Sequence, residues 1–341
     1  MRAAVLVPAA SGQTGRIELE ERAAPEPGPG EVLVDVRAVG VCGSDVHYYE
    51  HGRIGDFVVE APMVLGHESA GVITAVGPGV TGLAVGQRVS VEPGVPDRSC
   101  AQCLAGRYNL CPDMRFFATP PIDGAFAEQV VVHQAFAHPV PDSMSDDAAA
   151  LLEPLSVGIW ACRKGRVGAG SRVLVTGAGP IGLVAVQTAL AFGATSVVVS
   201  DVNPARLELA GALGATELVD ARSTSVTEIE PPTVLLECSG FPPAINQGIR
   251  ALDRAGRAVL VGMGGDEIPL PLSAVQGREL EVTGTFRYAN TWPTAIALVA
   301  AGRVDLDRLV TGHYGLADAE KSLTVGRSDP SSIKVIVHPD R

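Results

Sequence analysis

The sequence contains no basic run and carries few positive charges for its size. Its 26 lysine and arginine residues are outnumbered by 38 aspartate and glutamate residues, which gives a formal net charge of −12. Nucleic acids and anionic membrane surfaces attract proteins through clustered positive charge. We therefore expect neither nucleic acid nor a membrane among the partners of this protein.

Neither a targeting signal nor a membrane helix is evident in the sequence. The N-terminal MRAAVLVPAASG is too weakly apolar for a secretory signal and is typical of a first strand. Residues 173–200 carry no charged side chain and are long enough to cross a bilayer. However, GAGPIG and FGATS interrupt this segment, which favours a buried β-α-β unit over a membrane span. The expected location is the cytoplasm.

Cysteine is scarce, with six residues in 341, and three of them lie between residues 95 and 111. Disulfide frameworks are typical of short secreted chains with dense cysteine spacing. This usage instead fits a reducing compartment and metal sites. Cys162 and Cys238 stand alone in apolar runs, which predicts that they pack in the core.

The chain also lacks internal repeats and low-complexity segments, and its length suggests about two domains. Residues 1–150 are rich in Gly and Pro and contain short alternating runs such as GEVLVDVRAVGVC and AFAEQVVVH, which predicts a mostly β domain. In residues 151–289, strand-like runs such as RVLVTG and SVVVSD alternate with helix-like runs. This alternation predicts an α/β domain with a doubly wound parallel sheet. Residues 290–341 end in a strand, SIKVIVH, and we expect this tail to complete the first domain.

The segment TGAGPIG, residues 176–182, follows a predicted strand and opens a predicted helix. Gly177, Gly179 and Gly182 fit the dinucleotide-binding pattern G-x-G-x-x-G, in which the helix N-terminus favours phosphate charge. Asp201 closes the next strand, 19 residues beyond Gly182, and a carboxylate there binds ribose hydroxyls and repels a 2′-phosphate. The pattern therefore predicts NAD, not NADP. Arg206 is either a contact for the adenosine end or a solvated helix charge.

Two short segments and one acid in an apolar run carry candidate metal ligands. Cys42 lies in GVCGSDVHYYEHG, His67 and Glu68 lie in GHESAGVITAVGPGV, and Glu153 lies in the apolar run AAALLEPLSVGIW. A carboxylate in apolar company is costly to bury unless a cation or hydrogen bonds meet it. Each residue alone could be an ordinary core or surface side chain. Together with a dinucleotide site they indicate a catalytic zinc with an open position.

At this point the sequence resembles a known family. The pattern G-H-E-x2-G-x5-G-x2-V, residues 66–80, resembles the signature of zinc-containing medium-chain dehydrogenases. CGSDVHYYEHG, GRYNLCP, FFATPPIDGAF, EPLSVG and TFRYANTWP are similar to their polyol branch, which includes sorbitol and xylitol dehydrogenases. The similarity covers nearly the whole chain. It implies a GroES-like catalytic domain, residues 1–150 completed by 290–341, and a Rossmann NAD-binding domain, residues 151–289.

The resemblance also implies roles for individual residues. Cys42, His67 and Glu68 would hold zinc, and Glu153 would face the metal through a water or contact the polyol; classical alcohol dehydrogenases have a second Cys at that position. The substrate hydroxyls would be contacted by Tyr48, Glu153, Arg287 and Tyr288. The cofactor would be contacted by Gly177, Gly179, Ile181, Gly182, Asp201, Arg206, Val261, Gly262, Met263, Thr285, Phe286 and Arg287.

The implied reaction is oxidation of a secondary hydroxyl of a sugar alcohol to a ketose, with zinc as Lewis acid and NAD as hydride acceptor. Ser44 and His47 are placed to relay the proton to solvent. Ser44 could also be a helix N-cap, and the two roles are compatible. Asp45 is a candidate partner that orients His67.

The three clustered cysteines form the second candidate zinc site. Asp97, Cys100, Cys103 and Cys111 keep the x2, x2, x7 spacing that the four cysteines of zinc-bearing relatives have. Three thiolates and a carboxylate make an acceptable zinc shell, so we expect a structural zinc with Asp97 as fourth ligand. The alternative is an empty lobe, or one in which water replaces the carboxylate.

Two rival functions stay open at this point. One is a zinc dehydrogenase for simpler secondary alcohols, which would leave Tyr48, Arg287 and Glu153 without polar partners. The other is a non-catalytic structural or redox-responsive relative, which should have lost zinc ligands. The family resemblance implies a homotetramer.

Overall fold

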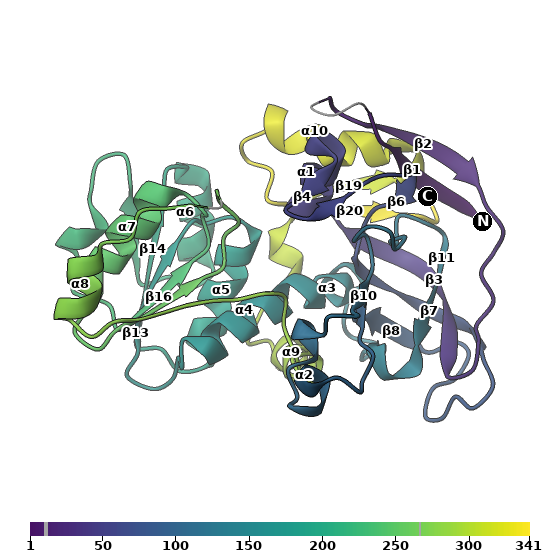
Figure 1. The fold of residues 1–341 in the computed structure, drawn as a ribbon, viewed down its shortest axis with the longest axis horizontal. Helices are drawn as coiled ribbons and strands as arrows, with labels where there is room; N and C mark the ends of the chain where they lie inside the picture. Colours follow the sequence, from purple (N-terminus) through teal and green to yellow (C-terminus); the bar gives the residue numbers. More distant parts are fainter. Residues whose placement is uncertain (10–12, 266) are drawn as a thin grey trace. The chain divides into compact units, whose positions relative to one another are not determined.

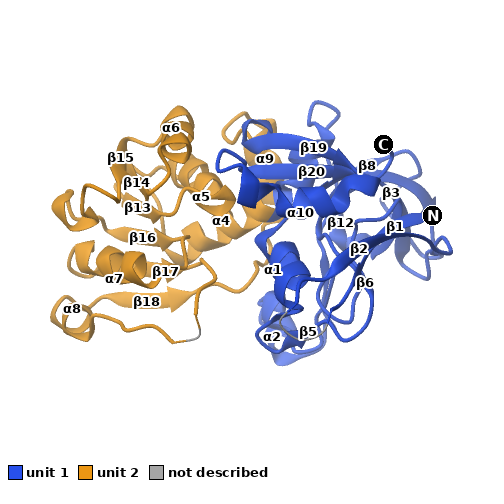
Figure 2. Ribbon diagram, turned by 90° about the horizontal axis from the view of Figure 1, so that it is seen from above, with its two compact units in different colours: residues 1–153, 306–341 blue, residues 154–305 orange. Residues whose placement is uncertain are grey.

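The computed structural model describes residues 1–9, 13–265 and 267–341. The chain divides into two compact units, coloured separately in Figure 2. The first unit comprises Met1–Glu153 and Leu306–Arg341, and the second comprises Pro154–Asp305. The second unit is therefore inserted into the sequence of the first, and both described ends of the chain belong to the first.

Antiparallel strands dominate the first unit. Its largest sheet has the order β12-β8-β7-β3-β20-β19, with β11 also paired to β3. The strands of this unit are β1 (Arg2–Val7), β2 (Arg16–Glu21), β3 (Glu31–Gly40), β4 (Arg53–Ile54), β5 (Phe57–Val58), β6 (Met63–Val64), β7 (Glu68–Val76), β8 (Arg88–Val91), β9 (Gly94–Val95), β10 (Arg115–Phe116), β11 (Gln129–His133), β12 (Ala137–Pro139), β19 (Val310–Gly315) and β20 (Lys334–His338). Its helices are α1 (Gly43–His51), α2 (Ala101–Leu104), α3 (Asp146–Ala150) and α10 (Ala319–Ser328).

The alternation in GEVLVDVRAVG explains why β3 forms the centre of this sheet. Val32, Val34 and Val36 are buried while the residues between them are partly exposed, as expected for a strand with one face on the core. The C-terminal strand β20 is buried along its whole length. It pairs with β3 on one side and with β19 on the other. The final strand thus joins the β unit, as the sequence predicts.

The second unit is a six-stranded sheet in which all neighbouring strands are parallel (Figure 1). The strand order β15-β14-β13-β16-β17-β18 is that of a dinucleotide-binding Rossmann fold. Its strands are β13 (Arg172–Thr176), β14 (Ser196–Asp201), β15 (Glu217–Asp220), β16 (Val234–Glu237), β17 (Arg257–Leu260) and β18 (Glu281–Gly284). Its helices are α4 (Leu152–Lys164, which begins in the first unit), α5 (Pro180–Ala191), α6 (Pro204–Ala212), α7 (Pro242–Ala251), α8 (Leu272–Gly277) and α9 (Trp292–Ala300).

Helices cover both faces of this parallel sheet, which is why its strands are apolar throughout. Gly248 of α7 lies against Leu235, whereas Gly165, just after α4, lies against Val234 and Leu236. Because successive strand residues point to opposite faces, α7 and α4 pack on opposite sides of β16. Residues 173–200 are therefore a strand, a helix and a strand. No helix in the described part of the chain is long and apolar enough to span a membrane.

The sequence predicts that the chain returns to the first domain at residue 290. In the structure, residues 290–305 still belong to the second unit. Hydrogen bonds to α4 and α5 hold this segment. Arg163 of α4 donates to the Asn290 carbonyl at 2.8 Å and to Thr294 Oγ1 at 2.9 Å. Gln187 of α5 accepts from the Asp305 N–H at 2.7 Å. These contacts link residues distant in sequence, so no local pattern indicates them.

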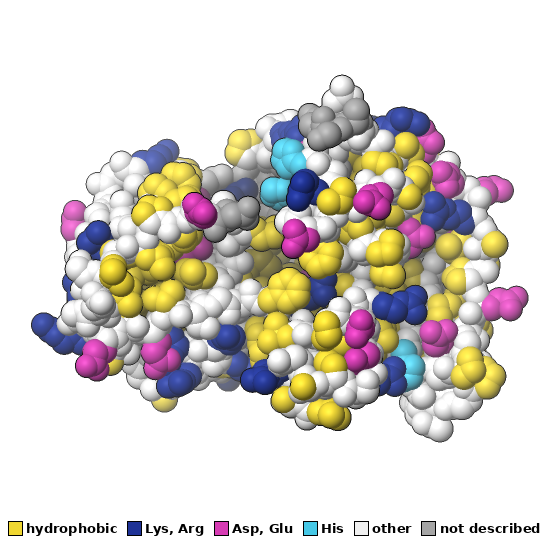
Figure 3. Space-filling model, in the orientation of Figure 1, with side chains coloured by type: hydrophobic (Ala, Val, Ile, Leu, Met, Phe, Trp, Pro, Cys, Tyr) yellow, Lys and Arg dark blue, Asp and Glu magenta, His cyan; other side chains and the backbone are white. Residues whose placement is uncertain are grey.

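Charged side chains of both signs are interspersed on the face drawn in Figure 3. Lysine and arginine alternate with aspartate and glutamate over this face, and exposed apolar side chains lie between them.

Candidate active site and metal centres

Cys42 marks the start of α1 and is fixed there by Asp45. Cys42 has an extended backbone, and the carboxylate of Asp45, three residues on, accepts a 2.9 Å hydrogen bond from its N–H. The other oxygen of Asp45 accepts from the Gly66 N–H, also at 2.9 Å. Asp45 is completely buried. One carboxylate therefore ties the cysteine segment to the segment that carries His67 and Glu68.

His67 and Glu68 lie where β7 begins, directly after Gly66, whose φ of 85° requires glycine. The Cys42 thiol, an imidazole nitrogen of His67 and a carboxylate oxygen of Glu68 all lie within 4.8 Å of one another. Glu68 Oε2 is buried and accepts no hydrogen bond within the described part of the chain. The structure thus brings together three residues that the sequence predicts as zinc ligands, with one carboxylate oxygen left for a cation.

The electrostatics of this cluster also fit a cation. Burial alone would lower the pKa of His67, but the Cys42 thiolate, a hydrogen bond to it, and the charges of Asp45 and Glu153 raise that pKa to about 10. Buried anions stabilise a positive charge that lies close to them. A divalent metal would satisfy this charge and the free oxygen of Glu68 together, so the residues present fit zinc.

Lys334 is a buried cation that the sequence prediction missed. Its ammonium group donates to Glu68 Oε1 at 2.6 Å and to the Val41 carbonyl at 2.8 Å. Burial would lower its pKa, but the charges of Glu68, Cys42 and Glu153 keep the pKa above its ordinary value. The signal was present in SIKVIVH, where one lysine stands in an apolar strand and must meet an anion if that strand is buried.

The remaining predicted residues of the first unit lie around α1 and α4. Glu153 is 5% exposed and Tyr48 is 4% exposed, while Ser44 is half-buried and His47 is exposed. The suggestion that Ser44 is an N-cap is wrong, because Cys42 occupies that position and Asp45 bonds back to its N–H. The predicted contact of Asp45 with His67 is loose, with 3.8 Å between Oδ1 and Nδ1.

The cysteine lobe forms a second cluster of ligand atoms. One atom from each of Asp97, Cys100, Cys103 and Cys111 lies within 4.8 Å of the others. Asp97 Oδ1 accepts from the Ser99 N–H at 2.8 Å and the Cys100 N–H at 3.0 Å, and these bonds lower its pKa. The carboxylate of Asp97 is therefore ionised at neutral pH beside three thiols. Among all six cysteines of the chain, the structure contains no disulfide.

The glycine-rich turn of the second unit has the geometry of a dinucleotide site. Gly177 has φ 87°, and a side chain on Gly182 would meet the Gly177 carbonyl oxygen at 1.8 Å. A side chain on Gly179, the N-cap of α5, would meet nothing within 4 Å. The three glycines therefore provide the turn, the close packing of helix on strand, and an open approach for a phosphate.

Asp201 ends β14 beside this turn. Its Oδ2 accepts from the Ala178 N–H at 2.6 Å and its Oδ1 accepts from the Asn203 N–H at 2.8 Å. It therefore also orders the turn, which the sequence did not indicate. Arg206, in the first turn of α6, is half-buried, and its Nε has no hydrogen-bond partner within the described part of the chain. This placement favours a ligand contact over a freely solvated charge.

The other predicted cofactor residues follow β17 and β18, on the edge of the sheet where the parallel strands end. Val261, Gly262 and Met263 come directly after β17, and Thr285 and Phe286 come directly after β18. Met263 is 56% exposed and Phe286 is 47% exposed, although both are large and apolar. Ligands of doubly wound sheets bind at this edge. Ile181 is half-buried in the first turn of α5.

Arg287 and Tyr288, the predicted substrate contacts of the second unit, differ in exposure. Arg287 has φ 52° and lies over the Phe286 ring, 4.8 Å from its centre. Tyr288 is 3% exposed and packs on Trp292. Their participation in one site with Tyr48 and Glu153 stays a prediction. Of the isolated cysteines, Cys162 is fully buried, as predicted, while Cys238 is half-buried.

Comparison with known proteins gives the family. Residues 28–142 match the alcohol dehydrogenase GroES-like domain, and residues 180–301 match the zinc-binding dehydrogenase domain. A sorbitol dehydrogenase of Bacillus subtilis is 43% identical over 100% of this chain and 98% of its own length.

Two solved structures have the same fold. L-idonate 5-dehydrogenase from Escherichia coli has a TM-score of 0.90 and 31% identity, over 99% of this chain and 97% of that chain. The 2R,3R-butanediol dehydrogenase of Bacillus subtilis has a TM-score of 0.89 and 31% identity, over 99% of this chain and 100% of that chain. The predicted combination of a GroES-like domain and a Rossmann domain is confirmed, and the chain belongs to the zinc-binding medium-chain dehydrogenases, in their polyol branch.

Proposed function

We propose that this enzyme is a zinc- and NAD-dependent polyol dehydrogenase that oxidises a secondary hydroxyl of sorbitol, xylitol or a similar sugar alcohol to a ketose. The observation that carries the proposal is the buried cluster of Cys42, His67 and Glu68, with an oxygen of Glu68 left free. The relative named sorbitol dehydrogenase, 43% identical along the whole chain, supports the choice of substrate class.

Cys42, His67 and Glu68 would hold the catalytic zinc. When bound, this metal supplies Lewis-acid chemistry that lowers the pKa of an alcohol oxygen toward neutrality. Asp45 holds the backbone of both ligand segments through two buried hydrogen bonds. Ser44 and His47 would pass the proton outward, because Ser44 is half-buried and His47 is exposed on the same helix.

The substrate's remaining hydroxyls would be bound by polar side chains around the reacting carbon. We assign Tyr48 and Glu153 of the first unit and Arg287 and Tyr288 of the second unit to this role. Sites that hydrogen-bond a hydroxyl discriminate strongly against analogues that lack it, because buried polar groups are then left unpaired. Tyr48 and Glu153 are almost fully buried.

The cofactor would lie along the edge of the parallel sheet where its strands end. The pyrophosphate would approach the α5 N-terminus at Gly179, and the ribose would meet Asp201. A carboxylate at that position favours NAD over NADP. The nicotinamide end would cover the exposed apolar side chains of Met263 and Phe286.

A dehydrogenase for simpler secondary alcohols or diols is the second candidate. The structural similarity to 2R,3R-butanediol dehydrogenase favours it, although the identity is 31%. A non-catalytic relative is the third candidate, and the intact set of ligand residues speaks against it.

Initial rates distinguish these candidates. The purified enzyme would be assayed with NAD and a panel of four- to six-carbon polyols, butane-2,3-diol and propan-2-ol, while metal content per chain is measured. We expect the highest kcat/KM with a polyol, and loss of activity together with one zinc in Cys42→Ser. A preference for butane-2,3-diol would favour the second candidate. Absence of NADH formation by the zinc-loaded protein would favour the third.

We further propose that the protein is a cytoplasmic homotetramer that works on a small-molecule polyol. Unpaired thiols throughout the chain are compatible with a reducing compartment. Sedimentation velocity of the purified enzyme would give the subunit number, and a monomer or dimer would contradict the proposed assembly.

A further inference from the structure

A third cluster of potential metal ligands lies on the first unit. It comprises Asp147 on α3, His313 on β19 and His338 on β20, with one ligand atom of each within 4.8 Å of the others. The parallel register pairs His313 with Ile336, and His338 lies two residues further along the same strand. Side chains two residues apart share a face of a sheet, so both imidazoles point to the same side, with ring centres 5.2 Å apart.

The hydrogen bonding of His338 leaves one ring nitrogen for a ligand. Its Nδ1 lies 2.8 Å from the Arg37 carbonyl oxygen, which can only accept, so Nδ1 carries a proton. In the neutral ring, Nε2 then carries a lone pair. This Nε2 is buried and has no hydrogen-bond partner within the described part of the chain, and Asp147 Oδ1 lies 3.5 Å away. Metal-binding histidines commonly donate their second N–H to a backbone carbonyl in this way.

Asp147 and His313 complete the cluster. His313 Nε2 lies 2.7 Å from Asp147 Oδ2, and the exposed fractions of the side chains are 47% for His313, 17% for Asp147 and 7% for His338. The buried His338 therefore lies at the inner side of the cluster. The more exposed His313 lies at its solvent side, where an ion can enter. The cluster faces a surface hollow of about 280 Å³ that Ser145, Asp146 and Asp340 also line.

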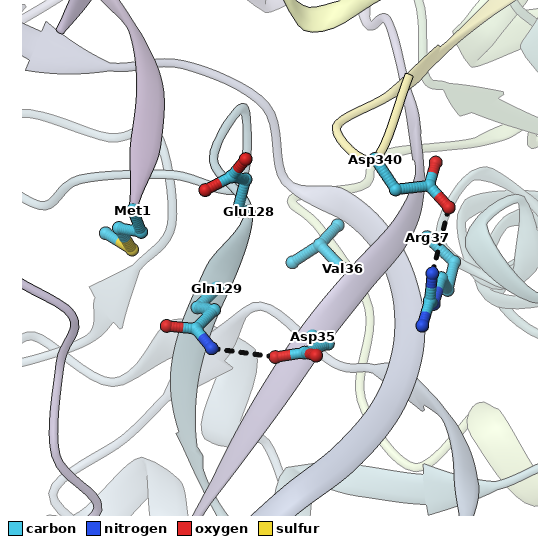
Figure 4. Close-up of a pocket in the computed structure, with 7 residues that line it drawn as sticks. All are labelled: Met1, Asp35, Val36, Arg37, Glu128, Gln129 and Asp340. Carbon is cyan, nitrogen blue, oxygen red and sulfur yellow. Dashed lines mark hydrogen bonds and ion pairs between the residues drawn. The ribbon is translucent and has the colours of Figure 1, made fainter. Parts of the chain in front are cut away.

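Two arginines also border this hollow, and their charge opposes a cation. Arg37 is paired with Asp340 at 2.9 Å, as the close-up of the neighbouring pocket in Figure 4 shows, so its charge is compensated. Arg341 lines the hollow as well. Asp146 is paired with Arg88, which leaves the carboxylate of Asp147 to offset the charge of Arg341. The charges of the side chains that line the hollow therefore offset one another. Binding of an ion then depends on the lone pairs of the two imidazoles and the carboxylate.

We propose that Asp147, His313 and His338 form a binding site for a borderline divalent cation such as Zn²⁺, separate from the two clusters described above. Two imidazoles and one carboxylate are a typical protein ligand set for zinc, with further positions taken by water. Bound there, the ion would tie α3 to β19 and β20. Strand β20 also carries Lys334, the partner of Glu68, so the ion would fasten the strand that supports the candidate active site.

The test measures zinc binding at neutral pH in the full-length protein, after dialysis against a weak chelator has left only tightly held metal. Wild type, His313→Ala and Asp147→Asn would be titrated with Zn²⁺ against a chromophoric indicator. His133→Ala serves as the matched control, since His133 is a partly exposed histidine of the same unit outside all three clusters. Thermal unfolding would be followed with and without added Zn²⁺.

We expect the wild type and His133→Ala to bind one additional zinc per chain and to unfold at a higher temperature when it is present. His313→Ala should bind this zinc at least about tenfold more weakly and lose the thermal shift. His313 is half exposed, so this variant keeps the test valid even if Asp147→Asn fails to fold. Equal additional binding by wild type and His313→Ala, or no additional binding by wild type, would overturn the proposal. In the second case the contact between His313 and Asp147 is a hydrogen bond without a metal-binding role.

Discussion

At the scale of single residues, Lys334 and Glu68 form a buried ion pair in which each charge depends on the other. Replacing Lys334 with Met leaves Glu68 as an uncompensated buried carboxylate. Removing one partner of a buried pair costs about 3–5 kcal/mol. We expect the metal-depleted Lys334→Met variant to lose about that much stability in urea unfolding, and added zinc to restore part of it by replacing the ammonium opposite Glu68.

Lys321→Met is the control for this experiment. Lys321 is exposed and paired with Asp318 on the surface, so its loss should change stability by about 0.5 kcal/mol or less. If the two variants are equally stable without metal, the pair between Lys334 and Glu68 does not have the role assigned to it.

Asp201 is a second residue with a testable role, in the choice of cofactor. Its carboxylate also accepts hydrogen bonds from Ala178 and Asn203, so Asp201→Ala removes both charge and turn contacts. Asp201→Asn removes the charge but keeps one acceptor oxygen, so it loses only one of these two contacts. We expect both variants to reduce the NAD-over-NADP ratio of kcat/KM by about tenfold or more, because the repulsion of a 2′-phosphate is lost. A wild type that uses both cofactors equally would contradict this assignment.

At the scale of elements, the loop from β9 to β10 contains the cysteine lobe, and we expect a zinc bound there to order it. If Asp97 completes a zinc site there, wild type should retain two zincs per chain after dialysis against a weak chelator, and Asp97→Ala should retain about one. Asp97→Asn is the control, because it preserves an acceptor for the Ser99 and Cys100 N–H groups without the charge. One retained zinc in wild type, with three titratable thiols in the lobe, would mean that the lobe is vacant.

A partly buried hydrogen bond with a defined pH dependence is one of the polar links between helices α1 and α10. Tyr49 donates to Glu320 at 2.6 Å, and burial together with this bond raises the pKa of Tyr49 to about 12. The folded state thus favours the neutral phenol. The resulting stability, on the order of 2 kcal/mol, is fully present below pH 10 and is lost as the pH rises through about 12.

Tyr49→Phe should therefore be less stable than wild type near neutral pH, and the gap should narrow by about pH 11. Urea unfolding at the two pH values measures this gap. Tyr314→Phe, a half-buried tyrosine of the same unit, should show no such convergence. A gap that stays constant between the two pH values would contradict the role of the phenol.

At the scale of the whole molecule, the first unit closes only when β20 reaches β3 from the far end of the chain. A chain that ends at residue 333 lacks this fully buried strand and both of its pairings. We expect the first unit to lose cooperative folding, because its central sheet gains an open edge beside β3. The second unit builds its sheet without strands from the first, so NAD binding should survive.

Hydrogen exchange measured by mass spectrometry, with NAD titrations by calorimetry, would show this division. Amide protection should collapse in residues 1–153 and persist in the core of residues 154–305. Equal loss of protection in both units would mean that they fold as a single cooperative body.

The sequence by itself determined the features whose residues lie close together in the chain. Gly177, Gly179 and Gly182 follow a strand and begin a helix within seven residues, and strand and helix periods are visible in the chain itself. The cysteine lobe is likewise contained between residues 97 and 111. Because short spacings constrain geometry directly, the glycine-rich turn, the clustering of the four side chains of the lobe and the fold class all follow from the order of the residues.

Only the tertiary structure decided which distant residues meet. Lys334 reaches Glu68 across 266 positions, and His338 reaches His313 because β20 lies beside β19. The segment 290–305 belongs to the second unit because Arg163 and Gln187 bind it. The first two contacts follow from the place of β20 in its sheet, and the third follows from side-chain hydrogen bonds of α4 and α5. These interactions depend on the packed core and leave no periodic trace in the sequence.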